Sequence, residues 1–389
     1  MTRAWEAVLA LAPAPGARPD WETVLASPLR PVLRPMADTP QNPRWHGEGD
    51  VLAHTRLVCE RLAELPAWRR LPETQRQELF LAALLHDLGK TVTTRWEDGA
   101  WTSPRHAVRG AGMVRQLLWT DFELCGTPDK QAFRETVCSL VRHHMIPARA
   151  ASLTDPTRKA IAVAAEGRLI PHFTNRLLTM LAQADALGRI ASDTEAVLER
   201  VAFYGEFALE AGCLDGPYPF VSPAARYAYL TGKSAWPGYE PYDETWGEVV
   251  LLSGLPGVGK DTYRAGSLAQ LPMVSLDALR RSMGVDPLRP QGAVAAAARE
   301  AAREHLRRRE AFVWNATDTT PLIRQKQTSL FARYGASTRI VYLETGWAAL
   351  LGRNAARRES VPEGVIRHLL ADLIPPMDHE AQAVVWLCV

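Results

Sequence analysis

Two groups of residues in this 389-residue chain have the types and spacing that suit phosphate chemistry. The first half carries a series of imidazole and carboxylate side chains, namely His54, His86, Asp87, His106, His143, His144 and Asp185. The second half opens with a glycine-rich segment, GLPGVGKDT, at residues 254–262. Imidazoles and carboxylates hold divalent metals that activate water, whereas a glycine-rich loop before a helix cradles phosphates with its backbone N–H groups. The pattern predicts one half that removes phosphate and another that adds it.

Helices are expected to position the first group. Residues 1–205 show apolar side chains at three- and four-residue spacing, as in ELFLAALLHDLGK, and no alternating strand pattern interrupts them. We therefore predict an all-α domain over residues 1–205. Residues 206–245 are rich in Pro, Gly and aromatic side chains, which predicts a packed linker.

Strands and helices alternate in the remainder of the chain. EVVLLSG precedes the glycine-rich segment, and PMVSLD, EAFVWNAT and STRIVYLET are further short apolar runs next to helical stretches. Such alternation is typical of a parallel sheet covered by helices. Residues 246–389 are accordingly predicted to form an α/β domain.

Composition limits the class of protein. With 47% hydrophobic and 23% charged residues the chain can bury two cores. Its formal net charge is only +2, so the overall charge gives no indication of nucleic-acid binding. The arginine-rich stretch 299–309 is expected to be a solvated helix face. Five scattered cysteines without C-x-x-C spacing indicate reduced thiols and a cytoplasmic location. No apolar run approaches 20 residues, so we expect no membrane span.

The His86-Asp87 pair ends an apolar helix, where burying both groups is costly unless a partner such as a divalent metal satisfies them. Asp50 is expected to cap the next upstream helix and to set His54 one turn in, facing inward. The alternative is that some of these are ordinary core histidines bonded to backbone. The remaining histidines, His46, His172, His305, His368 and His379, lack this context and are expected at the surface or as caps.

The segments EGDVLAHT, LLHDLGK and VRHHMIP, in the order H, HD, H, H, D over residues 45–190, resemble the HD phosphohydrolase superfamily. The resemblance implies one metal held by His54, His86, Asp87 and Asp185 and a second held by His106 and His143, with Asp87 bridging; which of His143 and His144 binds is left open. All-His/Asp ligation suits Mn²⁺, Co²⁺, Ni²⁺, Fe²⁺ or Zn²⁺. Lys90 or Arg109 could neutralise the bound phosphate.

The glycine-rich segment predicts an NTP site. Gly254, Gly257, Val258 and Gly259 would supply the backbone cradle, and Lys260 would reach the β- and γ-phosphates of ATP or another NTP with Mg²⁺. Asp261 stands where the usual pattern has Ser or Thr, so Thr262 is the better hydroxyl candidate. Asp261 must then point away from the triphosphate or bind magnesium through water.

Further candidates follow the loop. Asp277 ends the second predicted strand and could accept a proton from an attacking hydroxyl, or it could simply cap the next helix. Arg280 lies one turn later, and Arg353 and Arg357 share a side of another helix, where they could clamp phosphate or face solvent. Asn315 ends the strand FVWNAT, and no strand ends in a plain aspartate that would hold magnesium.

Together, GLPGVGKDT, SLDALR and RNAAR resemble the phage-type polynucleotide 5′-kinases over residues 247–370. That resemblance implies Asp277 as general base, Arg280 as a contact to the acceptor strand's phosphate, and Arg353 with Arg357 as a lid. An HD module before such a kinase is similar to the bacterial HD-Pnk family, which phosphorylates 5′-OH ends and removes 2′,3′-cyclic, 2′- or 3′-phosphates. The implied partners are RNA or DNA ends, an NTP donor and a separate ligase. The alternatives are a small-molecule kinase fused to a nucleotidase, and a non-catalytic nucleotide-gated regulator.

Overall fold

The computed structural model describes residues 2–286, 290–357 and 359–389. The chain divides into two compact units, the first formed by Met1–Leu124 and Asp129–Tyr218 and the second by Cys125–Pro128 and Pro219–Val389. None of the helices in these ranges is both long and apolar enough to cross a bilayer. The predicted linker at 206–245 contains the end of one helix, α13, and all of another, α14.

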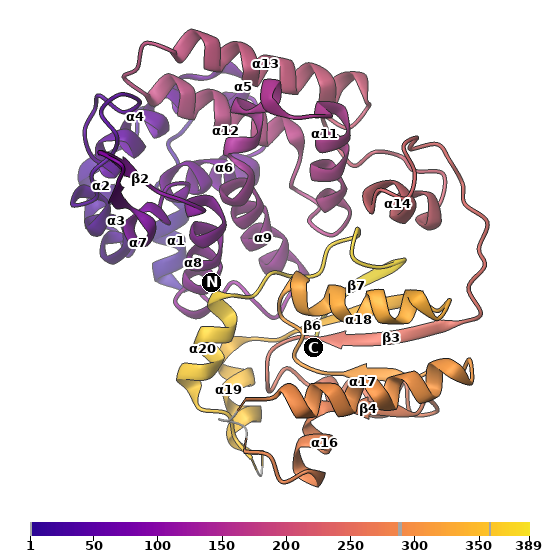
Figure 1. The fold of residues 1–389 in the computed structure, drawn as a ribbon. Coiled ribbons are helices and arrows are strands. Elements are labelled where there is room, and N and C mark those ends of the chain that lie inside the picture. Colours follow the sequence, from indigo (N-terminus) through magenta and orange to yellow (C-terminus); the bar gives the residue numbers. More distant parts are fainter. Residues whose placement is uncertain (1, 287–289, 358) are drawn as a thin grey trace. The chain divides into compact units, whose positions relative to one another are not determined.

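The first unit is helical (Figure 1). Its α-helices are α1 (Arg3–Leu9), α2 (Trp21–Ala26), α3 (Arg30–Ala37), α4 (Val51–Glu64), α5 (Pro66–Arg69), α6 (Glu73–Leu85), α7 (Lys90–Thr93), α8 (His106–Thr120), α9 (Pro128–His143), α10 (Met145–Ala148), α11 (Pro156–Ala164), α12 (Asn175–Gly188) and α13 (Thr194–Glu210). Two 3-10 helices, η1 (Ala150–Ser152) and η2 (Ala165–Arg168), complete the set. Helix α4 packs against α6 and α12, and α12 packs against α13.

Local sequence explains where α4 begins. The carboxylate of Asp50 accepts a hydrogen bond from the backbone N–H of Ala53 at 2.8 Å, which satisfies one of the free donors of the first turn. His54 follows one turn later and is fully buried beside Val58 and Leu62. The predicted cap and the predicted inward orientation of His54 are both confirmed.

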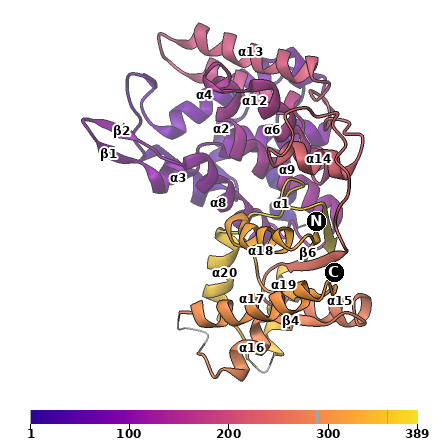
Figure 2. The ribbon, with the colours of Figure 1, turned by 45° about the vertical axis from the view of Figure 1, so that its right-hand side comes forward.

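The predicted helical domain is confirmed, although a short β-hairpin that was not predicted interrupts its helices. Strands β1 (Arg95–Glu97) and β2 (Ala100–Thr102) pair antiparallel, with Trp96 opposite Trp101. The turn residues Asp98 and Gly99 have φ of 51° and 78°, as a tight hairpin turn requires. Figure 2 shows the hairpin projecting from the helices of its unit. Six strand residues are too few for a periodic signal, although the Asp-Gly pair was a usable one.

The second unit is built on a five-stranded sheet of order β4-β5-β3-β6-β7, all parallel. Its strands are β3 (Glu248–Ser253), β4 (Met273–Ser275), β5 (Val313–Asn315), β6 (Ser337–Glu344) and β7 (Ala383–Cys388). Its helices are α14 (Pro223–Leu230), α15 (Lys260–Ser267), α16 (Leu276–Ser282), α17 (Gly292–Arg307), α18 (Pro321–Arg333), α19 (Trp347–Ala355) and α20 (Glu363–Ala371). The predicted α/β architecture is confirmed.

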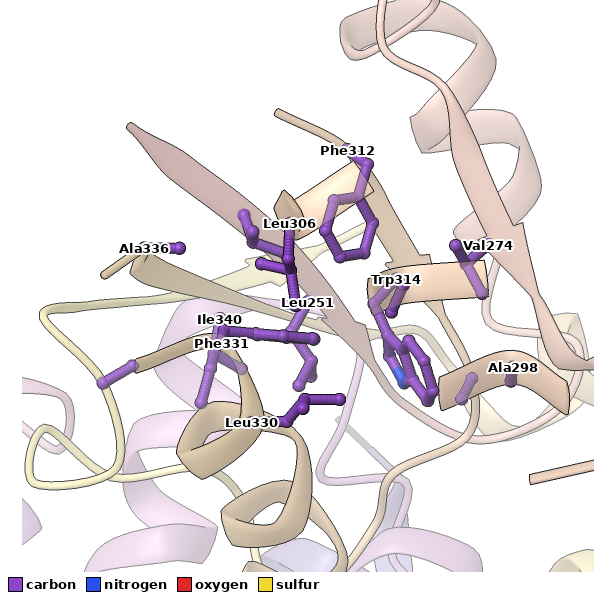
Figure 3. Packing of buried hydrophobic residues seen from close by; sticks show 14 residues of the cluster. Leu251, Val274, Ala298, Leu306, Phe312, Trp314, Leu330, Phe331, Ala336 and Ile340 are labelled. Atoms are coloured by element: carbon purple, nitrogen blue, oxygen red, sulfur yellow. The ribbon is translucent and has the colours of Figure 1, made fainter. Parts of the chain in front are cut away.

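Helices α17 and α18 cover one face of this sheet. Figure 3 shows Leu251, Trp314 and Ile340 of the sheet packed next to Leu330 and Phe331 of α18. The same cluster takes alanine and leucine side chains from α17. Because the small residues of α17 lie flat on the sheet, its arginines face outward, and Glu300 pairs with two of them at 2.7 and 3.0 Å. The expected solvated face of α17 is thus observed.

Gly89 controls the distance between two segments that carry candidate metal ligands. A Cβ atom at this position would lie 2.1 Å from the carbonyl oxygen of His106 and 2.6 Å from the backbone nitrogen of Gly110. Both are backbone atoms and cannot rotate away. The absence of a side chain at Gly89 therefore permits the close approach of α7 to α8.

We predict that Gly89→Ala destabilises the protein by about 1–3 kcal/mol, because one inserted methyl forces two backbone segments apart. Urea unfolding measures the change. Gly205→Ala is the matched control in the same unit, since a Cβ there would make an ordinary 3.5 Å contact with Thr179. Equal stabilities of the two variants would contradict the proposed close approach.

Candidate metal centre and phosphate loop

The carboxylate of Asp87 forms the middle of a cluster in the first unit. Asp87 is 1% exposed and follows His86, the residue that caps the end of α6. Its Oδ2 lies 2.7 Å from Nζ of Lys90 and 3.3 Å from Nε2 of His86, and its Oδ1 lies 3.3 Å from Nε2 of His106. His144 and His54 present Nε2 atoms to the same carboxylate at 3.9 and 3.8 Å.

Backbone carbonyls fix three of these imidazoles in one orientation. Nδ1 of His86 donates to the carbonyl of Ala83, and His106 and His144 do the same to carbonyls three residues before them, at distances of 2.7–2.8 Å. A carbonyl oxygen can only accept, so each Nδ1 carries the proton and each neutral ring keeps its lone pair on Nε2. The three lone pairs are therefore available to a cation beside Asp87.

The residues present fit divalent metal ions. Among the described residues three sets of donor atoms have their members within 4.8 Å of one another. Two of them share Asp87, one formed by His54, His86 and Asp87 and the other by Asp87, His106 and His144, and the third is formed by His46, Glu48 and His54. Nε2 of His86 and Oδ1 of Asp87 are buried and lack a hydrogen-bond partner among the described residues. Such orphaned polar atoms are costly in a protein interior unless a ligand satisfies them. Asp185 joins the first set through its Oδ1, 3.0 Å from Nε2 of His54.

The structure separates the two adjacent histidines. His143 ends α9 and its Nε2 lies 2.8 Å from Glu166, which also accepts a hydrogen bond from Ser139. His144 enters the cluster instead, with its Nε2 3.4 Å from that of His106. The resemblance implied His143 and left the choice between the two open; the structure brings His144, and not His143, to the donor atoms around Asp87. One residue of helix rotates a side chain by about 100°, so only one of two neighbours can face the centre.

Sequence reasoning missed a flanking pair. His46 was expected at the surface or as a cap, but its Nδ1 lies 2.8 Å from Oε1 of Glu48. The same Oε1 lies 2.8 Å from Nδ1 of His54. Glu48 also accepts from the backbone of Ile190 at 2.9 Å. The available signal was the position of both residues just before the cap of α4. Glu48 orients the outer nitrogen of a candidate ligand, as carboxylates commonly do around metals.

A hollow of about 330 Å³, here called the centre hollow, opens onto the cluster. Asp87, His106, His144 and Asp185 reach it. Its cationic lining residues are Lys90, Arg149, Arg189 and Arg200. Arg109, the other residue expected to neutralise phosphate, is exposed on α8 and is not part of this lining. Lys90 lies in this lining, and its contact to a bound phosphate stays a prediction.

The charges in the cluster shift one another's pKa values. Burial would raise the pKa of Asp87, but Lys90 and the neighbouring histidines outweigh it and hold that pKa well below its usual range. Burial lowers the pKa of His144 to about 3, with help from His86 and His106. Burial also lowers the pKa of His106. At neutral pH the centre thus offers an ionised carboxylate and uncharged rings at His106 and His144, the forms that bind metals. Burial would lower the pKa of His54 as well, but the carboxylates of Asp185 and Glu48 outweigh it and raise that pKa to about 9, so His54 would give up a proton on binding a metal.

The glycine-rich segment of the second unit forms a loop between β3 and α15. Gly254, Gly257 and Gly259 have φ of 145°, 84° and 101°, a region that favours glycine. Helix α15 begins at Lys260, whose Nζ donates to the carbonyls of Gly254 and Leu255 at 2.7 and 3.0 Å. Burial lowers the pKa of Lys260 to about 8. The loop curls around its lysine as a phosphate cradle does.

Asp277 and its arginines lie near this loop. Oδ1 of Asp277 is 2.6 Å from Nη1 of Arg280, and Oδ2 is 3.3 Å from Nη2 of Arg357. Burial would raise the pKa of Asp277, but Arg280, Arg357 and Lys260 outweigh it and lower that pKa. The alternative capping role does not apply, because Ser275 caps α16 with its side chain. Arg353 donates to the carbonyl of Val258 at 3.1 Å.

The loop after β5 supplies contacts that the sequence left open. Nδ2 of Asn315 donates to Oδ1 of Asp261 at 2.7 Å, so Asp261 has a partner to one side of the loop. Thr262 is exposed on α15. Asp318, absent from the predicted site, is 5% exposed, has φ of 40° and accepts from the indole of Trp314 at 2.9 Å. Its position three residues beyond the strand end hid it from a search for strand-terminal aspartates.

Comparisons with known proteins match each unit separately. Residues 50–189 match the HD domain family, and residues 249–376 match an AAA domain family. An HD phosphohydrolase domain and a P-loop, kinase-like domain are therefore present in one chain. The match and the cluster together imply divalent metals in the first unit, and the loop implies an NTP with Mg²⁺ in the second.

Curated relatives are more distant. The chain is 32% identical over 162 residues to a "Multifunctional CCA protein" of Teredinibacter turnerae, covering 41% of this chain and 35% of that protein. A protein of the same description from Hahella chejuensis is 28% identical over 160 residues, covering 41% and 34%. One from Methylococcus capsulatus is 33% identical over 130 residues, covering 33% and 27%. The chain thus spans about a third of the length of the curated relatives it matches.

We predict that His144→Ala loses bound metal while His143→Ala keeps it, because only His144 presents Nε2 to Asp87. Metal content after dialysis against Mn²⁺ or Co²⁺, read by mass spectrometry, measures the difference. The loss of one ligand should weaken binding by at least about 10–100-fold, the range seen even for outer partners of ligands. Retention of metal by His144→Ala together with its loss from His143→Ala would reverse the assignment.

A second prediction concerns Asp318, whose pKa is raised by burial from its ordinary value to about 6. Below about pH 4 the group is protonated in both folded and unfolded chains, and between about pH 4 and pH 6 the folded chain binds more protons. Its contribution to stability is therefore lost as pH rises through about 6. Asp318→Asn should match the wild type near pH 4 and exceed it by about 1–3 kcal/mol at pH 7. Urea unfolding of the wild type and of Asp318→Asn between pH 4 and pH 7 measures this difference in stability. A difference that does not vary with pH contradicts the prediction.

Proposed function

We propose that this protein heals nucleic-acid ends, with an NTP-dependent 5′-hydroxyl kinase in the second unit and a metal-dependent phosphoesterase in the first. The observation that carries the proposal is the pairing, in one chain, of a two-set His/Asp centre around Asp87 with a phosphate loop next to the ionised Asp277. Removing a 2′,3′-cyclic, 2′- or 3′-phosphate and adding a 5′-phosphate yields the ends that a ligase joins. This combination is that of the HD-Pnk family.

In the kinase unit each named side chain has a distinct task. The backbone of residues 254–259 and Lys260 would hold the NTP phosphates, and the Thr262 hydroxyl would be a ligand to Mg²⁺. Asp277 stays ionised at neutral pH because its pKa is lowered, so it can accept the proton of a 5′-hydroxyl. Arg280 and Arg357 flank that carboxylate and are placed to contact phosphate groups on either side of the reacting oxygen.

In the phosphoesterase unit the protein supplies ligands, charge and shape. His54, His86, Asp87 and Asp185 would hold one metal, and His106 and His144 would hold a second with Asp87 shared. Bound metals of this kind lower the pKa of water toward neutrality and polarise a phosphoryl oxygen. Lys90 holds the shared carboxylate at 2.7 Å and presents positive charge to the centre hollow, where the phosphate would lie.

The decisive experiment uses one oligonucleotide with a 5′-hydroxyl and a 2′,3′-cyclic phosphate, incubated with the protein, ATP and a panel of divalent ions. Comparison of RNA and DNA versions of the oligonucleotide shows which nucleic acid the protein prefers. Both ends are then read. Phosphorylation of free nucleosides as efficient as that of oligonucleotides would instead favour a small-molecule kinase fused to a nucleotidase.

We predict that the two activities separate by mutation. Asp87→Ala should abolish phosphate removal and leave the kinase near wild type, because the donor sets belong to one unit and the loop to the other. Asp277→Ala should do the opposite and slow phosphorylation by about 10²–10⁴-fold through loss of the base. Gel analysis of both ends measures each activity. Loss of both activities in a folded single variant would contradict the two-site assignment.

A further inference from the structure

A second, larger hollow adjoins the centre hollow in the first unit. It measures about 700 Å³ and is here called the outer hollow. Both hollows are lined by Trp45, His46, Lys90, His106 and Arg149. Because they share these walls, a molecule with its phosphate beside Asp87 can extend from one hollow into the other. The volume suits a ligand well beyond the size of a phosphate group.

The charges around the outer hollow have one sign. Lys90, Arg105, Arg142 and Arg149 line it, and no carboxylate side chain is among its lining residues in the described part of the chain. The centre hollow, in contrast, has three aspartates in its wall. A site for a metal needs those carboxylates, whereas a wall with cations alone suits an anionic ligand such as a phosphodiester.

Two indole rings give the outer hollow aromatic surface. Trp45 is 39% exposed, and the Arg44 guanidinium lies 4.6 Å from the centre of its ring. Trp101 is half-buried on β2 and contacts Trp96 edge to face, with ring centres 5.2 Å apart. The hairpin β1–β2 thus carries an indole into the wall of the hollow. Aromatic rings combined with cations form the surface on which single-stranded nucleic acids stack their bases.

Arg105 connects the outer hollow to the centre. It is exposed, precedes His106 directly and has φ of 57°, a left-handed conformation that is costly for an arginine. Strain of this kind is retained where the surroundings require one orientation of the chain. Here the strained residue lies between the hairpin and a candidate metal ligand. Arg105 is therefore the direct sequence neighbour of His106, a residue that would hold a metal at the phosphoesterase centre.

We propose that the outer hollow binds the terminal nucleoside and the flanking phosphodiester of a nucleic-acid 3′ end whose terminal phosphate lies beside Asp87. The proposal rests on the function proposed above and names its substrate class. Trp101 stacks on the terminal base, and Arg105 contacts the flanking phosphodiester. The phosphoesterase is then adapted to polynucleotide ends and acts less efficiently on small phosphate monoesters.

Three substrates test these roles: glycerol 2-phosphate, a nucleoside 3′-monophosphate and an oligonucleotide with a 3′-phosphate. Trp101→Ala should raise KM by about tenfold for the two substrates that contain a base and leave glycerol 2-phosphate unchanged. Trp101→Phe keeps an aromatic ring and should retain most of the affinity. Arg105→Gln should raise KM by about tenfold for the oligonucleotide alone, since only that substrate has a flanking phosphodiester.

Arg95→Gln is the matched control, because Arg95 lies on the same hairpin, pairs with Glu97 at 2.8 Å and is outside the lining of the outer hollow. Its KM values should equal those of the wild type. Fluorescence anisotropy of a labelled oligonucleotide bound in EDTA gives a second readout, in which Arg105→Gln should bind more weakly than Arg95→Gln.

The outcomes separate the two proposals. If the wild type hydrolyses neither these three substrates nor an oligonucleotide with a 2′,3′-cyclic phosphate, the proposed phosphoesterase function fails, and the outer hollow loses its assigned role with it. If the wild type is active but Trp101→Ala and Arg105→Gln change all three substrates equally, or change none, the function stands and the assignment of the outer hollow is overturned. Thermal unfolding of each variant identifies a loss that arises from the fold of the hairpin.

Discussion

Burial of the Asp87 carboxylate is the constraint on which the first unit depends. An ionised carboxylate moved into an apolar interior costs many kcal/mol unless cations or donors compensate it. Lys90 gives part of that compensation at 2.7 Å, and the imidazole nitrogens that face the carboxylate from several helices would give the rest through a bound cation. The helices must therefore converge on one point, and Gly89 is what allows α7 and α8 to approach closely enough. Each of these polar side chains would be costly to bury alone, but together they form a site for a cation.

In the second unit, the negative charge of a bound phosphate would be met by backbone N–H groups of the glycine-rich loop more than by buried charged side chains. Strand β3 lies in the middle of the sheet, between β5 and β6, and delivers the glycine-rich loop to the carboxyl edge. Strands β4 and β5 end at the same edge, which brings Asp277 and Asn315 near the loop. Parallel order thus assembles residues that are far apart in the sequence.

Much of this could be predicted from residue patterns, because each confirmed feature has a local cause. Helical periodicity, the Asp50 cap and the strand-loop-helix context of Lys260 all act within a few residues. The choice between His143 and His144 could not be made, since it depends on the rotation of one helix end relative to four other segments. Glu48 and Asp318 were missed for a related reason: each acts through contacts with residues brought near by folding, and neither matches a sequence pattern for its role. The hairpin was missed because it is very short.

The three bonds from Nδ1 to carbonyls three residues upstream have an evolutionary consequence. The acceptors are backbone atoms of Ala83, Ser103 and Val141, so the side chains at these positions do not set the orientation of the ligands. Any residue that preserves the local turn leaves the imidazoles aimed at Asp87. Sequence drift around the centre is then tolerated more readily than in sites whose ligands are oriented by other side chains. Relatives could diverge widely here while their histidines keep the same geometry.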